Sequence, residues 1–354
     1  MIDNIKIDSI HIGTGLKPII VAEMSGNHNQ SLDKALQIVE EVAKTGAHAL
    51  KIQTYTADTL TIDKKDGDFF LGDKNSLWFG MSMFELYQQA HTPWEWHKPI
   101  FERCNELGLL CFSSPFDETA VDFLEDLECP CYKIGSTENT DFNLLKKVAK
   151  TGKPLIISTG MATISELGEM VSTVRKAGCK ELVLLKCTAA YPAKPSDANL
   201  LTIPHMSKMM NCHIGLSDHT SGTGVSVAST ALGAVMIEKH FTISRKDGGV
   251  DSKFSMEPHE FKQMVIDTEV AWSALGEINY GPTNNENSNL SRRSLYIVKD
   301  MKKGEIITKE NVRSIRPGYG LSVKYFDDIM GMKVTKDILR GTRLSFETIE
   351  GALS

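Results

Sequence analysis

The sequence lacks any long hydrophobic run. No apolar stretch among its 354 residues approaches the length of about 18 residues that a membrane-spanning helix requires. The opening stretch, MIDNIKIDSIHIG, has no apolar core of the kind found in a secretory signal. We therefore expect neither a membrane protein nor a secreted one, and we place the chain in the cytoplasm.

A strong excess of one charge is also missing. The formal net charge is −6, and charged residues make up 24% of the chain. Nucleic acids and anionic membranes attract strongly basic surfaces, so we expect neither as a partner. A local basic pocket for a small phosphate compound stays open, because net charge does not report on pockets.

Cysteine pairs with a recognisable spacing are absent too. The seven cysteines are an odd number, and most lie in apolar runs such as LLCFSS and LLKCT. Cys129 and Cys131 form the only close pair, and one intervening residue fits neither a zinc ribbon nor a redox CxxC motif. We expect free thiols in a reducing compartment.

A repeating pattern fills residues 18 to about 275. Each repeat is a short apolar run rich in β-forming residues, a polar cluster, and a stretch with helical periodicity. The apolar runs are 18–23, 47–53, 109–113, 131–136, 154–158, 182–187, 213–217 and 235–240. The predicted helices are 31–45, 82–107, 117–127, 142–151, 163–178, 199–210, 222–233 and 258–274.

This alternation predicts a parallel sheet covered by helices. Eight repeats in about 260 residues favour a closed (β/α)8 TIM barrel. A doubly wound sheet is the alternative, but it would need a glycine-rich phosphate turn after the first strand. That position reads EMSGNH, which is not such a turn.

The chain is predicted to contain a second, smaller domain. Residues 277–291 are rich in Asn, Gly and Pro, which is typical of a linker. The barrel domain then covers 1–276, and a compact unit of short strands and turns covers 292–354. Inside that unit KDMKKGEIITKENV and KDILRGTRLSFETI resemble each other, which predicts an internal repeat.

Polar side chains gather where the predicted barrel strands end. The carboxyl ends of barrel strands open onto one mouth, the usual place of an active site. In strand order the candidates are Glu23; Lys51 and Gln53; Ser114; Lys133, Ser136 and Glu138; Ser158; Tyr191; Ser217 and His219; and His240. We expect all of them around one cavity.

The residue types indicate two joined chemistries. Lys51 and Lys133, with hydroxyl groups nearby, suit a phosphate or a carboxylate. His219 and His240 suit a divalent metal such as Mn, Zn or Fe(II), with Glu23 as a third ligand or a substrate-binding acid. A Schiff-base aldolase, with a lysine as nucleophile, is the alternative enzyme class.

Three further features are less specific. Asp251 lies in a polar, glycine-rich stretch after the last strand, where it could bind sugar hydroxyls or cap a loop. Lys186 and Lys239 also lie near strand ends, but strand alternation could point either one outward. Trp94 and Trp96 are interpreted as packing residues.

The strand-end motifs resemble the sialic acid synthase family. These motifs are AEMSGNHN, KIQTYT, FSSPF, YKIGS, STGMAT, GLSDHT and IEKHF, in this order. The tail RSIRPGYG resembles the antifreeze-like (SAF, β-clip) domain that ends members of this family. The stretches KIQTYTADTLTID, LW (77–78), ELYQQAHTPWEWH, VDSKFS and RRSLY are most similar to the pseudaminic acid synthase branch.

The resemblance implies a transferase reaction. Phosphoenolpyruvate would condense with an amino-sugar aldehyde and water to give a 2-keto sugar acid and phosphate. For the pseudaminate branch the sugar is 2,4-diacetamido-2,4,6-trideoxy-L-altrose. The cofactor would be a divalent metal ion, Mn2+, Mg2+ or Co2+, and the assembly a domain-swapped homodimer.

The resemblance also implies residue roles. His219 and His240 would bind the metal, with His240, Glu23 and Glu138 catalytic. Phosphoenolpyruvate would contact Lys51, Gln53, Ser114, Lys133, Ser136, Ser158 and Ser217. The sugar would contact Tyr191, Asp251 and, from a neighbouring subunit, Arg316.

Two alternatives stay open within this interpretation. The same chemistry on another amino sugar would give N-acetylneuraminate or legionaminate. Neuraminate synthases carry Asn at the position of Ala189, which weakens that assignment. A non-enzymatic sugar-binding or ice-binding protein is suggested only by the C-terminal resemblance.

Overall fold

A computed structural model describes residues 2–74 and 76–352. The chain divides into two compact units, Met1–Gly276 and Glu277–Ser354. Across the described residues no helix is long and apolar enough to cross a membrane. Each unit has a hydrophobic core of its own, so each is described separately.

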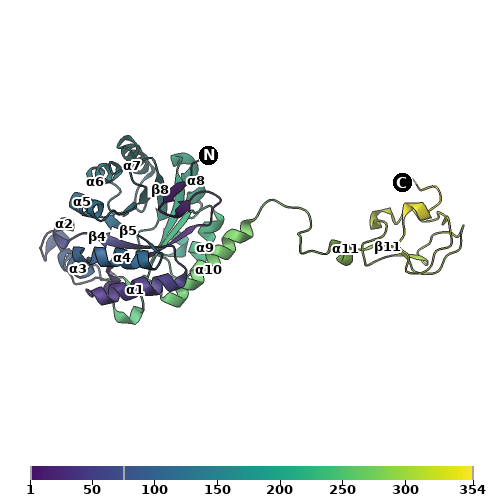
Figure 1. Ribbon diagram of the computed structural model, residues 1–354, viewed down its shortest axis with the longest axis horizontal. Helices are drawn as coiled ribbons and strands as arrows, with labels where there is room; N and C mark the ends of the chain where they lie inside the picture. The colour runs from purple at the N-terminus through teal and green to yellow at the C-terminus, as the bar shows by residue number, and fades with distance from the viewer. Residues whose placement is uncertain (1, 75, 353–354) are drawn as a thin grey trace. The chain divides into compact units, whose positions relative to one another are not determined.

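The first unit confirms the predicted (β/α)8 barrel. Within its described residues eight parallel strands close in the order β10-β3-β4-β5-β6-β7-β8-β9, and helices lie around their outer side (Figure 1). The barrel strands are β3 (Ile19–Glu23), β4 (Ala49–Thr54), β5 (Leu110–Pro115), β6 (Tyr132–Ile134), β7 (Leu155–Ser158), β8 (Leu182–Cys187), β9 (His213–Asp218) and β10 (Met236–His240). Each of them overlaps one of the predicted apolar runs.

The helices match the predicted pattern with two corrections, apart from the short helix α2, which was not predicted. They are α1 (Leu32–Thr45), α2 (Ala57–Leu60), α3 (Met83–Ala90), α4 (His97–Glu106), α5 (Glu118–Asp126), α6 (Phe142–Ala149), α7 (Ile164–Lys176), α8 (Thr202–Met210), α9 (Gly224–Ala231) and α10 (Pro258–Leu275). The single helix predicted over 82–107 is wrong. It is broken between α3 and α4 because Pro93 has no amide hydrogen and disfavours a helical conformation at Thr92.

The second correction is at the start of α8. The prediction began this helix at Asn199, whereas it begins at Thr202. Asn199 has a positive φ of 45°, which is incompatible with a right-handed helix.

A short hairpin precedes the barrel and was not predicted. It pairs β1 (Ile5–Ile7) with β2 (Ile10–Ile12) in antiparallel register. Its buried isoleucines join the barrel core. Nε2 of His213, the first residue of β9, lies 2.9 Å from the carbonyl oxygen of Asp3 and anchors the hairpin.

The second unit is built from β11 (Ser294–Ile297), β12 (Val312–Ile315), the short helix α11 (Ser288–Ser291) and several isolated bridges. The two predicted repeats lie against each other. Met301 and Ile338, which are equivalent in the repeats, exchange backbone hydrogen bonds of 2.8 and 2.9 Å. Asp300 and Asp337 form a second equivalent pair of contacts. The carboxylate of each accepts a hydrogen bond from a backbone N–H of the other repeat.

Candidate active site

A cavity of about 520 Å³ opens at the carboxyl ends of the barrel strands. It collects every site residue predicted in the barrel. These lining residues are Glu23, Lys51, Gln53, Ser114, Lys133, Ser136, Glu138, Ser158, Tyr191, Ser217, His219, His240 and Asp251. The predicted convergence on one mouth is therefore observed.

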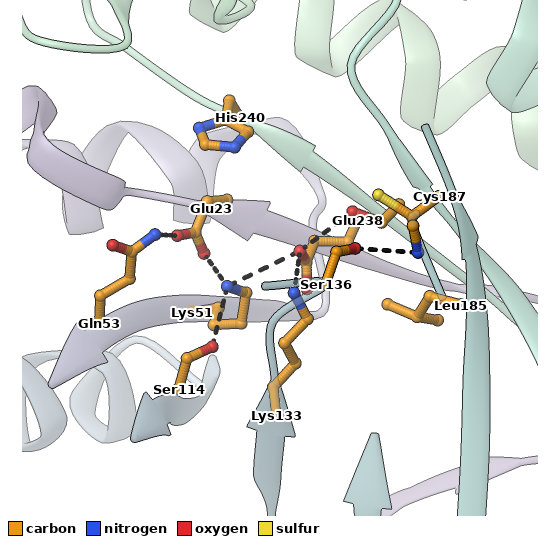
Figure 2. Close-up of polar contacts among 12 residues, drawn as sticks. Glu23, Lys51, Gln53, Ser114, Lys133, Ser136, Leu185, Cys187, Glu238 and His240 are labelled. Atoms are coloured by element: carbon orange, nitrogen blue, oxygen red, sulfur yellow. Dashed lines mark hydrogen bonds and ion pairs between the residues drawn. The ribbon is translucent and has the colours of Figure 1, made fainter. Parts of the chain in front are cut away.

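Two lysines and two glutamates form a charged cluster at the base of this cavity (Figure 2). Lys51 Nζ lies 2.7 Å from Glu23 Oε2 and 3.7 Å from Glu238 Oε1. Lys133 Nζ lies 3.4 Å from the same Glu238 oxygen. All four side chains are buried, so their charges interact with little screening by water.

The cluster shifts the pKa values of its two carboxyl groups in opposite directions. Burial works against the charged form of Glu238, but Lys133 and Lys51 outweigh it and lower its pKa. For Glu23 burial dominates and raises the pKa, even though Lys51 opposes the shift. The charged form of Glu238 is therefore favoured, whereas the raised pKa of Glu23 suits it to exchanging a proton.

Lys51 is held as an ammonium ion. Burial alone would lower its pKa, but Glu23 and Glu238 raise the pKa above its ordinary value. A Schiff-base lysine needs a neutral amine. The surroundings of Lys51 thus favour binding of an anion over nucleophilic attack.

Hydroxyl groups surround the two lysines. Ser114 Oγ accepts a hydrogen bond from Lys51 Nζ at 3.3 Å. Ser136 Oγ accepts from the backbone N–H of Gly160 at 3.1 Å. Ser158 Oγ is buried and has no hydrogen-bond partner in the described part of the chain. Ammonium groups beside a free hydroxyl form a site for an oxyanion.

The two histidines lie together on the neighbouring strand ends. Their ring centroids are 5.3 Å apart. His219 Nδ1 lies 2.9 Å from the Thr188 carbonyl oxygen. When the neutral ring donates its hydrogen there, Nε2 keeps a free lone pair. Burial, followed by repulsion from His219, lowers the pKa of His240 well below its ordinary value. His240 is therefore neutral and able to act as a ligand.

The donor set fits an open metal site. His240 Nδ1 is buried without a hydrogen-bond partner among residues 2–74 and 76–352, and it lies 3.9 Å from Asp251 Oδ2. Over the same residues no group of three or more His, Cys, Asp or Glu side chains converges on one point. A cation held by the two imidazoles, with the Asp251 carboxylate beside them, would keep coordination positions for water and substrate.

A chain of polar contacts links several segments around the cavity. Gln53 Nε2 donates to Glu23 Oε1 at 2.7 Å and to Ser25 Oγ at 3.3 Å. The Ser25 hydroxyl in turn donates to the Asp251 carboxylate. The chain of contacts joins the first strand to the loop after β10, so Asp251 takes part in the site rather than capping its own loop.

Comparison with known proteins agrees with this geometry. Residues 38–280 match the NeuB family. The chain belongs to the NeuB family. Residues 292–350 match the SAF domain, which corresponds to most of the second unit.

Two sugar acid synthases match this NeuB chain over nearly their whole length. It is 41% identical to the pseudaminic acid synthase of Helicobacter pylori over 95% of this chain and 99% of the relative. It is 35% identical to the N,N'-diacetyllegionaminic acid synthase of Legionella pneumophila, over 98% and 99% of the two chains. The crystal structure of N-acetylneuraminic acid synthetase from Leptospira borgpetersenii superposes with a TM-score of 0.72 at 30% identity, covering 80% and 94%.

Arg316 is the one predicted site residue outside the NeuB barrel. It lies in the SAF unit, directly after β12, and its side chain is exposed. Lys186 and Lys239, which were left off the predicted site, do not line the cavity. Lys239 pairs with Asp218 at 2.6 Å, and Lys186 donates to the carbonyl oxygen of Cys187 at 3.0 Å.

Several lining residues were missed from the sequence. Glu238 is the most important, since it contacts both lysines. Cys187 also lines the cavity. Burial raises the pKa of its thiol, but the neighbouring His219 outweighs burial and lowers the pKa to about 7. Ser25 and Trp78 also line the cavity; both lie in stretches that carry the family resemblance, but neither was predicted as a site residue.

Proposed function

We propose that the chain is a pseudaminic acid synthase. It condenses phosphoenolpyruvate with 2,4-diacetamido-2,4,6-trideoxy-L-altrose and water, giving pseudaminate and phosphate. The observation that carries this proposal is the union of a buried lysine cluster and an imidazole pair in one cavity. The identity to the Helicobacter pylori enzyme over nearly the whole chain selects the sugar.

Phosphoenolpyruvate binds at the lysine cluster. Lys51 and Lys133 neutralise its phosphate and carboxylate, which replace part of their present contact with Glu238. Hydroxyl and amide groups complete its binding site, namely those of Gln53, Ser114, Ser136, Ser158 and Ser217. The unpaired Ser158 hydroxyl gains a partner in this complex.

The sugar aldehyde binds at the imidazole pair. A divalent cation there (Mn2+, Mg2+ or Co2+) would supply Lewis acidity to the aldehyde oxygen, and His219 and His240 would hold it. Thr188 fixes the ring of His219 through its carbonyl oxygen. Glu138, Tyr191 and Asp251 face the carbon chain of the sugar.

Glu23 handles the proton of the attacking water. A carbon–carbon bond forms between the methylene carbon of phosphoenolpyruvate and the aldehyde carbon. The aldehyde double bond breaks, its oxygen takes up a proton to become a hydroxyl, and positive charge is left on the carbon that bears the phosphate. Water adds to this carbon and passes a proton to Glu23, whose raised pKa suits a base. The carbon–oxygen bond to phosphate then breaks, and Lys51 and Lys133 stabilise the departing anion.

The SAF unit completes the sugar site from a second copy. Arg316 of one subunit reaches the barrel of the other in a domain-swapped homodimer, where its guanidinium binds oxygen atoms of the sugar. The chain works in the cytoplasm, where its seven free cysteines stay reduced.

The choice of sugar is tested with a substrate panel. Phosphate release from phosphoenolpyruvate is measured with 2-acetamido and 2,4-diacetamido aldehyde sugars of defined stereochemistry. We expect the highest kcat/KM with the L-altro 2,4-diacetamido-2,4,6-trideoxy sugar. A higher value with N-acetylmannosamine, or with the diacetamido sugar that gives legionaminate, would contradict the proposal.

A further inference from the structure

One side of the cavity is apolar and takes no part in the chemistry described so far. It is formed mainly by the segment between β4 and α4, together with the loop after β10. We call it the apolar wall, and it consists of Leu60, Trp78, Met83, Leu86, Tyr87 and Val250. The charged groups of the site, by contrast, lie at the strand ends.

Trp78 is fixed in this wall. Its indole Nε1 donates to the carbonyl oxygen of Val250 at 3.1 Å, so the ring has no hydrogen-bond donor left for a ligand. Backbone hydrogen bonds from Leu71 to Met81 and from Gly80 to Leu71 close the loop that carries it. The indole therefore presents an apolar face in a defined position.

The apolar wall adjoins the imidazole side of the cavity. The ring of Tyr191 lies 6.2 Å from that of Trp78 and 4.5 Å from that of His219, between centroids. A sugar whose aldehyde is near the two histidines would thus extend its remaining carbons past Tyr191 toward Trp78.

We propose that the apolar wall, with Trp78 at its centre, selects a sugar that carries a methyl group at C6 and an acetamido methyl group at C4, where an ordinary 2-acetamido hexose carries hydroxyl groups. This inference rests on the proposed function and concerns the same site. Methyl groups of a 6-deoxy carbon and of an acetamido substituent gain by leaving water against this wall. Hydroxyl groups of an ordinary hexose would be buried there with few partners, which costs binding free energy.

The test compares two sugars in the wild-type enzyme and in four variants. Values of kcat/KM are measured for the 2,4-diacetamido-2,4,6-trideoxy aldehyde and for a 2-acetamido hexose that keeps its C4 and C6 hydroxyls. Trp78→Ala should lower the preference for the first sugar by about 10- to 100-fold, mainly through its kcat/KM. Trp78→Phe keeps an apolar ring and should retain most of the preference.

Two further variants guard against misinterpretation. Trp272 is a half-buried tryptophan beside the start of β10, far along the chain from the apolar wall, and Trp272→Ala should leave the preference unchanged. Leu60→Asn introduces a polar group into the wall without removing the indole. It should lower the preference in the same direction, which keeps the test valid if Trp78→Ala does not fold.

The outcomes separate this inference from the proposed function. A wild-type enzyme that prefers the diacetamido sugar, with an unchanged preference in Trp78→Ala and Leu60→Asn, overturns the role of the wall alone. An equal loss for both sugars also overturns it, since Trp78 would then only shape the loop. A wild-type enzyme that prefers the hydroxylated hexose overturns both proposals.

Discussion

At the scale of single residues, Lys133 is the cleanest probe of anion binding. It has one ion-pair partner among the described contacts, Glu238 at 3.4 Å, and it lines the cavity. Lys133→Met removes a charge that the account assigns to phosphoenolpyruvate. We expect KM for phosphoenolpyruvate to rise by about 10- to 100-fold, the value of one or two charge-assisted contacts.

Steady-state kinetics at saturating sugar measure this change. Lys150→Met, an exposed lysine at the end of α6, is the matched control and should leave KM unaltered. An unchanged KM in Lys133→Met would remove this lysine from the substrate site.

Glu23 leads to a prediction about pH. Burial raises its pKa, and a general base must be ionised to accept a proton. Activity should therefore fall as the pH falls through this raised pKa, and recover above it. In Glu23→Gln we expect kcat to drop by about 100-fold or more and the acid limb of the pH profile to vanish.

The profile of log kcat against pH checks this assignment. Glu138→Gln is the informative comparison, because burial raises the pKa of Glu138 as well. If the acid limb persists in Glu23→Gln and disappears in Glu138→Gln, the base is Glu138.

Much of the site could be predicted at this scale, and one omission was avoidable. Side chains alternate along a strand, so Glu238 faces the same side as His240, while Lys239 faces the opposite side. Counting back two residues from His240, which is one full period of this alternation, would have identified Glu238 as a lining residue. Ser25 and Trp78 lie outside the strands, where no periodicity places a side chain, and their roles depend on tertiary contacts with Asp251 and Val250.

At the scale of elements, a buried ion pair joins β9 to β10 behind the histidines. Lys239 Nζ lies 2.6 Å from Asp218 Oδ2, and both side chains are about 1% exposed. Each residue directly precedes one histidine, and the two are register partners. The Asp218 carboxylate also accepts from Ser226 Oγ at 2.7 Å, so the pair is well satisfied.

Breaking this pair should destabilise the fold and disturb the imidazoles. Asp218→Asn leaves the Lys239 charge buried without a full counterion, which costs about 3–5 kcal/mol in the free energy of unfolding. We also expect weaker binding of Mn2+, because the two strand ends that carry the histidines are no longer joined by this ion pair. Urea denaturation and calorimetric titration of Mn2+ measure the two effects.

An exposed ion pair is the control. Asp122 pairs with Lys147 at the surface, and Asp122→Asn should cost at most about 1 kcal/mol. If Asp218→Asn were as stable as Asp122→Asn and bound Mn2+ normally, the ion pair would have no positioning role.

The order of strands and helices could be predicted from the sequence because buried parallel strands are nearly continuous apolar runs. The errors occur where one residue overrides periodicity. Pro93 divides a stretch that is otherwise helical in pattern, and Asn199 delays α8 through its positive φ. The hairpin β1–β2 was missed because each of its strands is only three residues long.

At the scale of the whole molecule, the proposed sugar site is complete only when two subunits associate. Arg316 lies in the SAF unit, and we propose that it serves the barrel of a second copy. Arg316→Ala and His219→Ala should each be inactive alone. Mixed after reversible dissociation, they should regain roughly a quarter of wild-type activity, because half the dimers pair the two variants and each of these holds one intact site.

Activity of the mixture, with the oligomeric state followed by light scattering, checks this prediction. A control mixture of His219→Ala with His240→Ala should stay inactive, since both changes fall in the barrel. If the first mixture also stays inactive while mixed dimers form, Arg316 does not act across subunits.

The fate of oxygen from water tests the central claim most directly. The claim is that water attacks the carbon that bears the phosphate, beside Glu23, and that the carbon–oxygen bond then breaks. With the reaction run in 18O-labelled water, mass spectrometry should find one label in the sugar acid, read at once before its keto group exchanges, and none in the phosphate. Label in the phosphate would mean cleavage of the phosphorus–oxygen bond and would contradict the account.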